Sequence, residues 1–294
     1  MNLAVCNETA PLESVILGIG VDRGQPRGIN PMIRKHMREN TSPTEARICS
    51  EIRTFEKVLL DNGVQVYRPM NLNQTEQIFT RDIGFVIEDY FFVSNMKYAV
   101  RAVELDGIKY ILDEIDPNKI IEVPKDVIIE GGDIILWDEF IFVGLGERTN
   151  EKGLAFLADF FPNKTVLGFD LVVDPIDVNK NILHLDCTFQ PIGQDQAIIY
   201  LDGFKAPPSA LLELFPADRL IKVNLDEKNK MFPNIFSISP TKIVIEQHFY
   251  RLKEELQQRG FEVFEVEYSE TSKLSGLLRC STLPLKRKGM LDRN

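Results

Sequence analysis

The hydrophobic positions of this chain switch between strand-like and helix-like spacing in a regular order. Ser14–Gly18 is a short apolar run typical of a strand, and Pro43–Asp61 repeats apolar residues at helical spacing. A second short strand is predicted at Val64–Tyr67. The segment Gly20–Ser42 is rich in Gly, Pro, Asn and Arg, which predicts a long mobile loop and a candidate lid over a binding site.

A hairpin pattern, two apolar runs around a short polar turn, then recurs along the chain. Its copies cover Phe79–Val93, Ile129–Gly144, His184–Leu201 and Asn234–Ile245. Helical stretches are predicted between them at Asn150–Phe161, Pro208–Phe215 and Gln247–Arg259. A strand follows each helix, at Thr165–Phe169, Leu220–Val223 and Phe261–Val266. The period of roughly fifty residues lies at the upper edge of ordinary repeat architectures.

One helix and one small hairpin cannot bury an apolar face, so such units are expected to pack around a common centre. The polar motifs that open the units would meet there. These motifs are Thr80–Asp82, Glu130–Asp133 and His184–Asp186, and a fifth unit ends in Arg279–Thr282. We predict one catalytic domain of α/β class over residues 1–285 and a flexible tail over residues 286–294.

Composition and charge limit the kinds of molecule that we expect the protein to bind. The 294 residues are 44% hydrophobic and 27% charged, enough for a substantial core. A formal charge of −10 argues against nucleic acid or an anionic membrane as a partner and fits a cationic small molecule. No secretory signal or membrane-length apolar run is seen, so we expect a cytoplasmic protein; the oligomeric state stays open, a homo-oligomer included.

The cysteines and histidines show no metal-site spacing. Four cysteines are scattered without a Cys-x-x-Cys pair, and the three histidines are far apart in sequence. We therefore expect reduced thiols, no metal and no cofactor.

The opening motifs suit the chemistry of a guanidinium group. This planar cation is bound by carboxylates through paired hydrogen bonds, for which the candidates are Asp82, Glu130, Asp133 and Asp186. Its carbon is a poor electrophile, which favours a thiolate such as that of Cys280. His184 is a group able to protonate a leaving amine and later activate water. Nearby carboxylates are expected to raise the pKa of Cys280.

Each of these residues also has a structural interpretation when taken alone. Cys280 can be a small buried hydrophobic residue, and His184 can be a hydrogen-bonded histidine of the core. Asp82 can cap a turn. Cys187 is expected to pack on the opposite face of a strand from Asp186. Only the ordered set of motifs distinguishes the catalytic interpretation.

That set resembles one known superfamily over nearly the whole chain. The segments that carry the resemblance are Glu8–Gly18, FTRD ending at Asp82, EGGD at 130–133, GERT at 146–149, HLDCTF at 184–189 and LRCSTLPL around Cys280. They resemble the guanidino-group-modifying enzymes, which include arginine deiminases, dimethylarginine dimethylaminohydrolases and glycine amidinotransferases.

The resemblance implies a fivefold pseudosymmetric α/β propeller of the pentein type, and it implies residue roles. Cys280 would be the nucleophile and His184 the general acid and then base, with Glu130 orienting His184. Asp82 and Asp186 would hold the guanidinium. Arg148 and Arg101 are the candidates for binding a substrate α-carboxylate.

The reaction expected from this resemblance is hydrolysis of a guanidino C–N bond through a covalent Cys280 thiouronium. Asp186 favours an unmethylated guanidino end, because methylated nitrogens cannot donate to a carboxylate. The chain is too short for the helical insertion of standard arginine deiminases, and Ser275–Leu278 replaces their glycine run. An amidinotransferase, a dimethylarginine dimethylaminohydrolase and a non-catalytic binder of arginine-like ligands remain alternatives.

Overall fold

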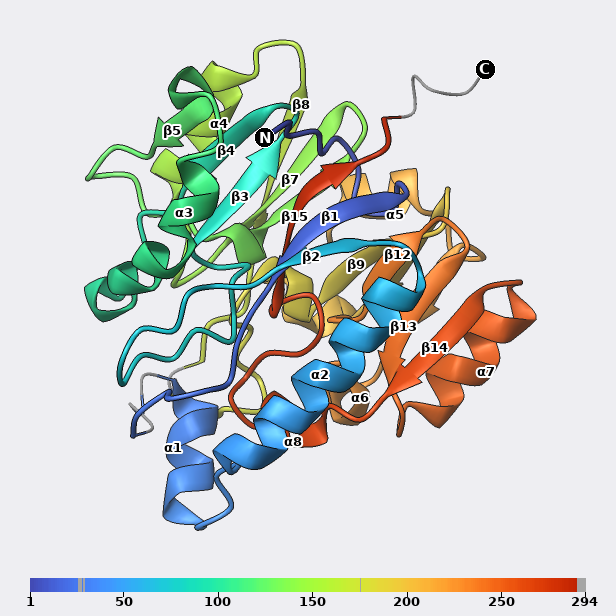
Figure 1. Ribbon diagram of the computed structural model, residues 1–294. Coiled ribbons are helices and arrows are strands. Elements are labelled where there is room, and N and C mark those ends of the chain that lie inside the picture. The colour runs from blue at the N-terminus through green and yellow to red at the C-terminus, as the bar shows by residue number, and fades with distance from the viewer. Residues whose placement is uncertain (26–27, 29, 175, 290–294) are drawn as a thin grey trace.

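Repeated three-stranded sheets dominate the computed structural model, which describes residues 1–25, 28, 30–174 and 176–289. The described residues form five such sheets, arranged as the blades of a propeller (Figure 1). In each blade two strands pair antiparallel, and a third strand runs parallel to one of them after a helical connection. The repeat predicted from the sequence is therefore confirmed.

The strands of the blades are short. The first blade contains β15 (Thr282–Arg287), β1 (Leu12–Leu17) and β2 (Gln65–Tyr67), and the second contains β3 (Gly84–Ile87), β4 (Tyr90–Val93) and β5 (Ile120–Glu122). The third blade contains β6 (Ile134–Trp137), β7 (Phe140–Leu145) and β8 (Thr165–Asp170), and the fourth contains β9 (Phe189–Ile192), β10 (Gln196–Ile199) and β11 (Leu220–Lys222). The fifth blade contains β12 (Phe236–Ser239), β13 (Lys242–Glu246) and β14 (Glu262–Val266).

Helices connect the strands on the outside of the blades. The α-helices are α1 (Pro31–Arg38), α2 (Glu45–Asp61), α3 (Lys109–Leu112), α4 (Glu151–Phe160), α5 (Ser209–Leu214), α6 (Leu225–Asn229), α7 (Tyr250–Gln258) and α8 (Ser269–Ser272). Short 3-10 helices are η1 (Ala99–Ile108), η2 (Pro117–Lys119), η3 (Gly131–Asp133), η4 (Leu185–Cys187) and η5 (Leu201–Gly203).

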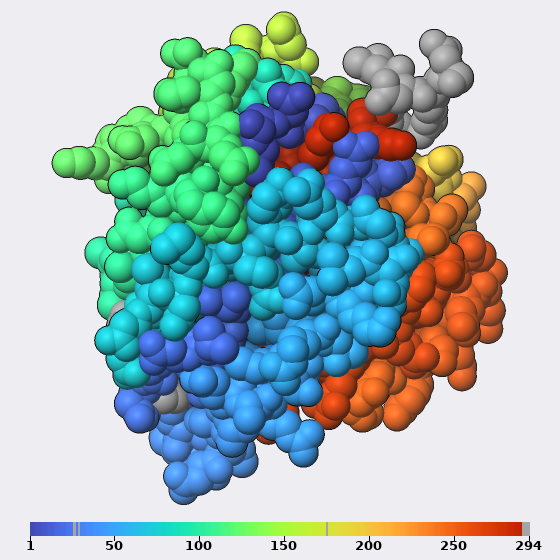
Figure 2. All heavy atoms as spheres, viewed as in Figure 1, coloured from blue at the N-terminus to red at the C-terminus, as the bar shows by residue number. Residues whose placement is uncertain are grey.

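The longest helix, α2, shows how the apolar pattern becomes packing. Ile48, Ile52, Phe55 and Leu59 recur at helical spacing and are at most 1% exposed. The ring of Phe55 makes edge contacts with Phe236, at 5.8 Å between centroids. Burial of a side chain of this size stabilises a fold by about 1.5–3 kcal/mol. In the space-filling view, the blue and cyan segment that contains α2 covers much of the face (Figure 2).

The first blade joins the two ends of the sequence. β1 pairs antiparallel with β15, with Val15 opposite Pro284, and lies parallel to β2 (Figure 1). Because β15 continues through Arg287, Lys286 and Arg287 belong to the blade, and the predicted tail boundary at residue 286 is two residues too early. Residues 290–294 lie outside the described residues.

The predicted loop Gly20–Ser42 contains a helix, which corrects part of that prediction. α1 begins after Asn30, whose side chain accepts a hydrogen bond from the N–H of Ile33, and Pro31 occupies its first turn. These capping residues outweigh the loop-like composition. Residues 26, 27 and 29 of the candidate lid lie outside the described residues.

The helices were compared with the length and apolar character of membrane-spanning helices. Among the residues that the structure describes, none of the helices combines the length and apolar character that a bilayer-spanning helix needs.

Candidate active site

Cys280 lies beside the FTRD motif, although about two hundred residues separate them in the sequence. The backbone N–H of Arg81 donates to the carbonyl oxygen of Cys280 at 3.0 Å. The Thr80 hydroxyl donates to the carbonyl oxygen of Ser281 at 3.1 Å. Cys280 is 2% exposed, so the thiol is held inside the propeller, where the charge of Asp82 acts on it.

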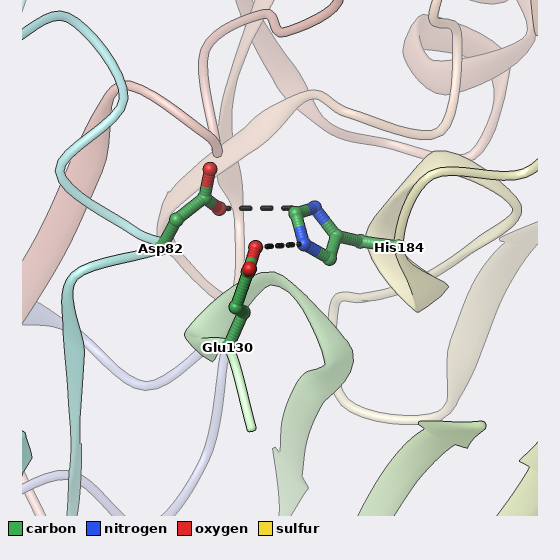
Figure 3. A group of neighbouring side chains, drawn as sticks. All are labelled: Asp82, Glu130 and His184. Carbon is green, nitrogen blue, oxygen red and sulfur yellow. Dashed lines mark hydrogen bonds and ion pairs between the residues drawn. The ribbon is translucent and has the colours of Figure 1, made fainter. Parts of the chain in front are cut away.

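One edge of the His184 ring faces two carboxylates, those of Asp82 and Glu130 (Figure 3). Its Nε2 is 2.9 Å from Oε2 of Glu130, and its Nδ1 is 3.7 Å from Oδ1 of Asp82. The ring and Glu130 are fully buried. Three opening motifs from three different blades therefore meet, as the repeat predicted.

The short turns that open the third and fourth blades make this arrangement possible. Glu130 and His184 immediately precede the 3-10 helices η3 and η4, which turn the chain sharply before β6 and β9. A Cβ atom at Gly132 would lie 2.6 Å from Nδ1 of His184. Only glycine lets the imidazole pack directly against this turn.

The carboxylates set the protonation state of the ring. Burial alone would lower the pKa of His184, but the charges of Asp82, Asp133 and Glu130 outweigh it and raise the pKa to about 9. Burial opposes ionisation of Glu130, yet the hydrogen bond and charge of His184, with the charge of Arg148, hold the pKa of that carboxyl below its usual value. At neutral pH the pair is an imidazolium beside a carboxylate.

Two buried polar atoms at this site face each other, and neither has a hydrogen-bond partner among the described residues. They are Oδ1 of Asp82 and Nδ1 of His184. Buried polar atoms in folded proteins nearly always have partners. A substrate nitrogen that approaches both atoms from the side, within hydrogen-bond distance of each, can donate an N–H to the carboxylate and receive a proton from the ring.

Asp186 is already paired with the residue before the nucleophile. Its Oδ2 accepts a hydrogen bond from Nη1 of Arg279 at 2.8 Å, and the same oxygen lies 3.7 Å from the sulfur of Cys280. Arg279 also donates to Oε1 of Glu8 at 2.8 Å. One arginine therefore holds two buried carboxylates, one of which contacts the thiol.

The thiol of Cys280 is strongly disposed to remain neutral in this environment. Burial contributes most to raising its pKa well above the ordinary value, and the charge of Asp186 adds to it. The direction agrees with the sequence-based expectation, but burial is a larger cause than the carboxylates.

The two arginines predicted to bind substrate lie against the carboxylates predicted to act in catalysis. Nη1 of Arg148 is 3.1 Å from Oε2 of Glu130, and its guanidinium lies 4.6 Å from the ring centroid of Tyr98. Nη1 of Arg101 is 2.7 Å from Oδ2 of Asp82. Both arginines are buried, so the structure brings both into the candidate site.

Asp133 lies behind the histidine turn. Its Oδ1 accepts the backbone N–H of Leu185 at 2.9 Å, between His184 and Asp186. Burial is the main cause that raises the pKa of Asp133 to about 7. This contact assigns Asp133 a supporting position within the site, and its predicted contact with substrate stays a prediction.

A metal has one candidate group among the described residues. The ligand atoms of Asp82, Glu130 and His184 lie within 4.8 Å of one another. A cation there would compete with the imidazolium at His184 and with Arg148, which already neutralise these carboxylates. The donor set therefore fits proton transfer better than metal binding.

The sequence reasoning assigned no role to Asn234, which lies next to Cys280. Its Nδ2 is 3.1 Å from the sulfur. Asn234 is the first residue of the fourth predicted hairpin, so its position in the repeat was the available signal. A single asparagine does not form a motif that can be identified in a sequence. Glu8 and Arg279, by contrast, lie within segments that resemble the guanidino-modifying enzymes.

Comparisons with known proteins agree with this geometry. A family model described as N,N dimethylarginine dimethylhydrolase, eukaryotic, matches residues 26–287. The uncharacterized protein YkgA of Bacillus subtilis (strain 168) is 30% identical over 256 residues, which cover 86% of this chain and 85% of that protein.

Solved structures share the fold at low sequence identity. The N-terminal domain of ArgZ, an arginine dihydrolase from cyanobacteria, has a TM-score of 0.81 at 20% identity, over 93% of this chain and 98% of that domain. The amidinotransferase SxtG from Microseira wollei has a TM-score of 0.78 at 17% identity, over 99% of this chain and 98% of that protein. The inosamine-phosphate amidinotransferase from Streptomyces griseus has a TM-score of 0.80 at 16% identity, over 98% of this chain and 97% of that protein. These likenesses confirm the predicted pentein propeller.

Proposed function

The chain belongs to the N,N-dimethylarginine dimethylhydrolase family, within the superfamily of guanidino-modifying enzymes, and we propose that it hydrolyses a C–N bond of a guanidino group in arginine or a related compound. The observation that carries the proposal is the buried pair of unpartnered atoms, Oδ1 of Asp82 and Nδ1 of His184, 3.7 Å apart. This pair suits a substrate nitrogen that must be held and then protonated.

In the first step the substrate cation enters among the carboxylates and offsets their charge. This lowers the cost of ionising Cys280, whose proton leaves to solvent as the cation binds. The thiolate attacks the guanidinium carbon and forms an S–C bond. The C–N bond to the leaving nitrogen then breaks, and the imidazolium of His184 donates its Nδ1 proton to that nitrogen. Ammonia or an amine departs.

In the second step neutral His184 takes a proton from water, and the resulting hydroxide attacks the same carbon. The S–C bond then breaks while the O–H proton of the adduct passes to the leaving sulfur, so that a neutral ureido product and the neutral Cys280 thiol form. Glu130 supports both steps because its hydrogen bond at Nε2 holds the ring orientation and stabilises the imidazolium.

The substrate has two candidate classes. Asp186 favours an unmethylated guanidino group, since a dimethylated nitrogen lacks the N–H that a carboxylate accepts and a monomethylated one keeps a single N–H. The family match favours a methylated arginine. Asp186 is also engaged by Arg279 at 2.8 Å, which reduces its availability for a substrate nitrogen. We place arginine-type substrates first and N-methylated arginines second.

Amidino transfer is the second candidate reaction. It shares the Cys280 intermediate and differs only in whether water or an amine attacks it. Two proteins with this fold are amidinotransferases by name, SxtG and the Streptomyces griseus enzyme. ArgZ, which also shares the fold, has been solved with substrate and with product bound.

One set of assays separates these alternatives. The protein is incubated with arginine, ω-N-methylated arginines, agmatine and guanidino acids, and ammonia, methylamines and ureido products are measured. The incubations are repeated with glycine or lysine as amine acceptors. Hydrolysis gives a ureido product without an acceptor, whereas transfer requires the acceptor. If Arg148 or Arg101 binds a carboxylate, agmatine is a poor substrate.

Variants complete the test. Cys280→Ser should reduce turnover by more than about a thousandfold. Cys49→Ser, a half-buried thiol on α2, serves as the matched control and should keep wild-type turnover. Absence of turnover with every substrate, together with equal ligand affinity in wild type and Cys280→Ser, would instead identify a non-catalytic binder.

A further inference from the structure

The side chain of Asn234 holds the loop that carries the nucleophile. Asn234 lies just before β12 and is 0% exposed. Its Oδ1 accepts the backbone N–H of Cys280 at 3.1 Å and that of Leu277 at 3.2 Å. Its backbone oxygen accepts the N–H of Arg279 at 3.3 Å. Three backbone N–H groups in the loop that carries the thiol are therefore fixed by one residue from another blade.

The amide group of the same side chain points at the reacting atom. Nδ2 of Asn234 lies 3.1 Å from the sulfur of Cys280 and 3.4 Å from the carbonyl oxygen of Asp186. The orientation of the amide is determined by the backbone, because two N–H donors require Oδ1 as their acceptor. The NH2 group is thereby directed toward the sulfur.

This donor has an electrostatic consequence. The charges of Asp186 and Asp82 oppose ionisation of Cys280. A neutral N–H donor adds no charge, yet it stabilises a thiolate more than a thiol, because hydrogen bonds to ionised acceptors are the stronger ones. Asn234 therefore counteracts the neighbouring carboxylates at the sulfur itself.

We propose that Asn234 is a further catalytic residue, which positions Cys280 through Oδ1 and stabilises its thiolate through Nδ2. The inference rests on the proposed role of Cys280 as nucleophile. It assigns the fifth blade, β12–β14, a contribution to the site, in the position where other blades supply Asp82, Glu130 and His184.

The first test separates the two roles of the side chain. In Asn234→Asp, a carboxylate oxygen still accepts the N–H groups of Cys280 and Leu277, but the donor to sulfur is replaced by a negative charge. Alkylation of Cys280 by iodoacetamide is followed by peptide mass spectrometry as a function of pH. We expect the alkylation rate at a fixed alkaline pH to fall about 10- to 100-fold, with the profile displaced to higher pH.

A second variant removes the donor without adding charge. The serine side chain in Asn234→Ser is too short to reach the sulfur, so it should displace the alkylation profile in the same direction by a smaller amount. This variant also covers the case in which Asn234→Asp does not fold.

A matched control perturbs the same segment without touching sulfur. Glu51 on α2 is buried and accepts the backbone N–H of Glu270 at 2.9 Å and of Thr271 at 2.7 Å, which anchors α8 before the nucleophile loop. Glu51→Gln should lower the thermal midpoint and leave the pH profile of Cys280 alkylation in place.

The outcomes are decisive. Displacement in both Asn234 variants but not in Glu51→Gln supports the proposal. An unchanged profile in the folded Asn234 variants, or an equal displacement in Glu51→Gln, overturns it. Alkylation needs no turnover, so this result is independent of the substrate assays: inactive protein with a displaced profile would refute the proposed reaction while leaving the Asn234–Cys280 contact established.

Discussion

Glu130 Oε2 lies 2.9 Å from Nε2 of His184, and both side chains are fully buried. The contact fixes which ring nitrogen faces Glu130 and leaves Nδ1 toward Asp82. Since the folded pKa of His184 is raised to about 9, the imidazolium persists through neutral pH and is lost only as the pH rises through that value. In the proposed reaction this imidazolium is the general acid, and it is present before substrate binds.

Glu130→Gln should move the alkaline limit of turnover. The amide removes one of the charges that raise the pKa of His184, so the fall in activity that begins near pH 9 should shift to a lower pH, while the charges of Asp82 and Asp133 still raise that pKa. Turnover at the optimum should drop about 10²- to 10⁴-fold. The measurement is kcat/KM against pH, with a titration of His184 by NMR.

Glu246→Gln is the control for this prediction. Nδ1 of His248 lies 2.8 Å from Oε1 of Glu246, a pair similar in chemistry but with a half-exposed histidine. Loss of this ion pair should leave the dependence of kcat/KM on pH unchanged. An alkaline limit that stays near pH 9 in Glu130→Gln would contradict the role of Glu130.

Cys280 should react slowly with iodoacetamide at pH 7 and faster only at alkaline pH. Burial and then the charge of Asp186 keep the thiol neutral. Cys6 and Cys49 are only partly buried and should be modified first, as peptide mass spectrometry will resolve. A thiol that titrates well below pH 7 in the free protein is incompatible with this environment.

The buried Glu8–Arg279 pair should stabilise the fold at neutral pH. Burial opposes ionisation of Glu8, but Arg279 and Arg81 lower its pKa to about 2. The stabilisation is complete above the usual glutamate pKa of 4.5 and is lost as the pH falls toward 2. Glu8→Gln should therefore reduce the free energy of unfolding at pH 7 by about 3–5 kcal/mol, measured with urea.

Glu13→Gln provides the comparison, since Glu13 pairs with Lys286 at 2.7 Å on a partly exposed surface. It should cost no more than about 1 kcal/mol. Glu8→Gln should also flatten the loss of stability between pH 4.5 and 2. Equal costs for the two variants would show that Glu8 is not a critical buried charge.

Gly132→Ala should disable the site while a nearby glycine tolerates the same change. The added methyl group would meet Nδ1 of His184 at 2.6 Å and displace the ring, which should cost about 100-fold in kcat. In Gly146→Ala the nearest atom lies at 3.7 Å, an ordinary contact, so activity and thermal midpoint should stay close to wild type. Similar activity in both variants would exclude the clash.

Periodicity predicted the blades because each depends on a local pattern. The hairpins at Phe79–Val93 and Ile129–Gly144 contain β3 with β4 and β6 with β7, and the motifs that open them converge. The site motifs could be read because Asp82, Glu130 and His184 stand at equivalent places in the repeat. Local pattern and shared position carried this information.

Long-range partners could not be read in the same way. Nothing in the sequence indicates that Arg101 meets Asp82 or that Arg279 joins Glu8 to Asp186, because these contacts depend on three-dimensional packing. Cys187 illustrates a local error: it lies in η4 rather than on a strand, and its sulfur is 3.5 Å from Oδ1 of Asp186.

The pairing of β1 with β15 sets the order in which the protein can become active during synthesis. When a ribosome has translated the segments that carry Asp82, Glu130 and His184, the growing polypeptide still lacks Cys280 and β15. Cys280 comes two residues before β15, which pairs with β1, the first of the described strands to be translated. The thiol that we expect to be the nucleophile is therefore made together with the strand that closes the ring.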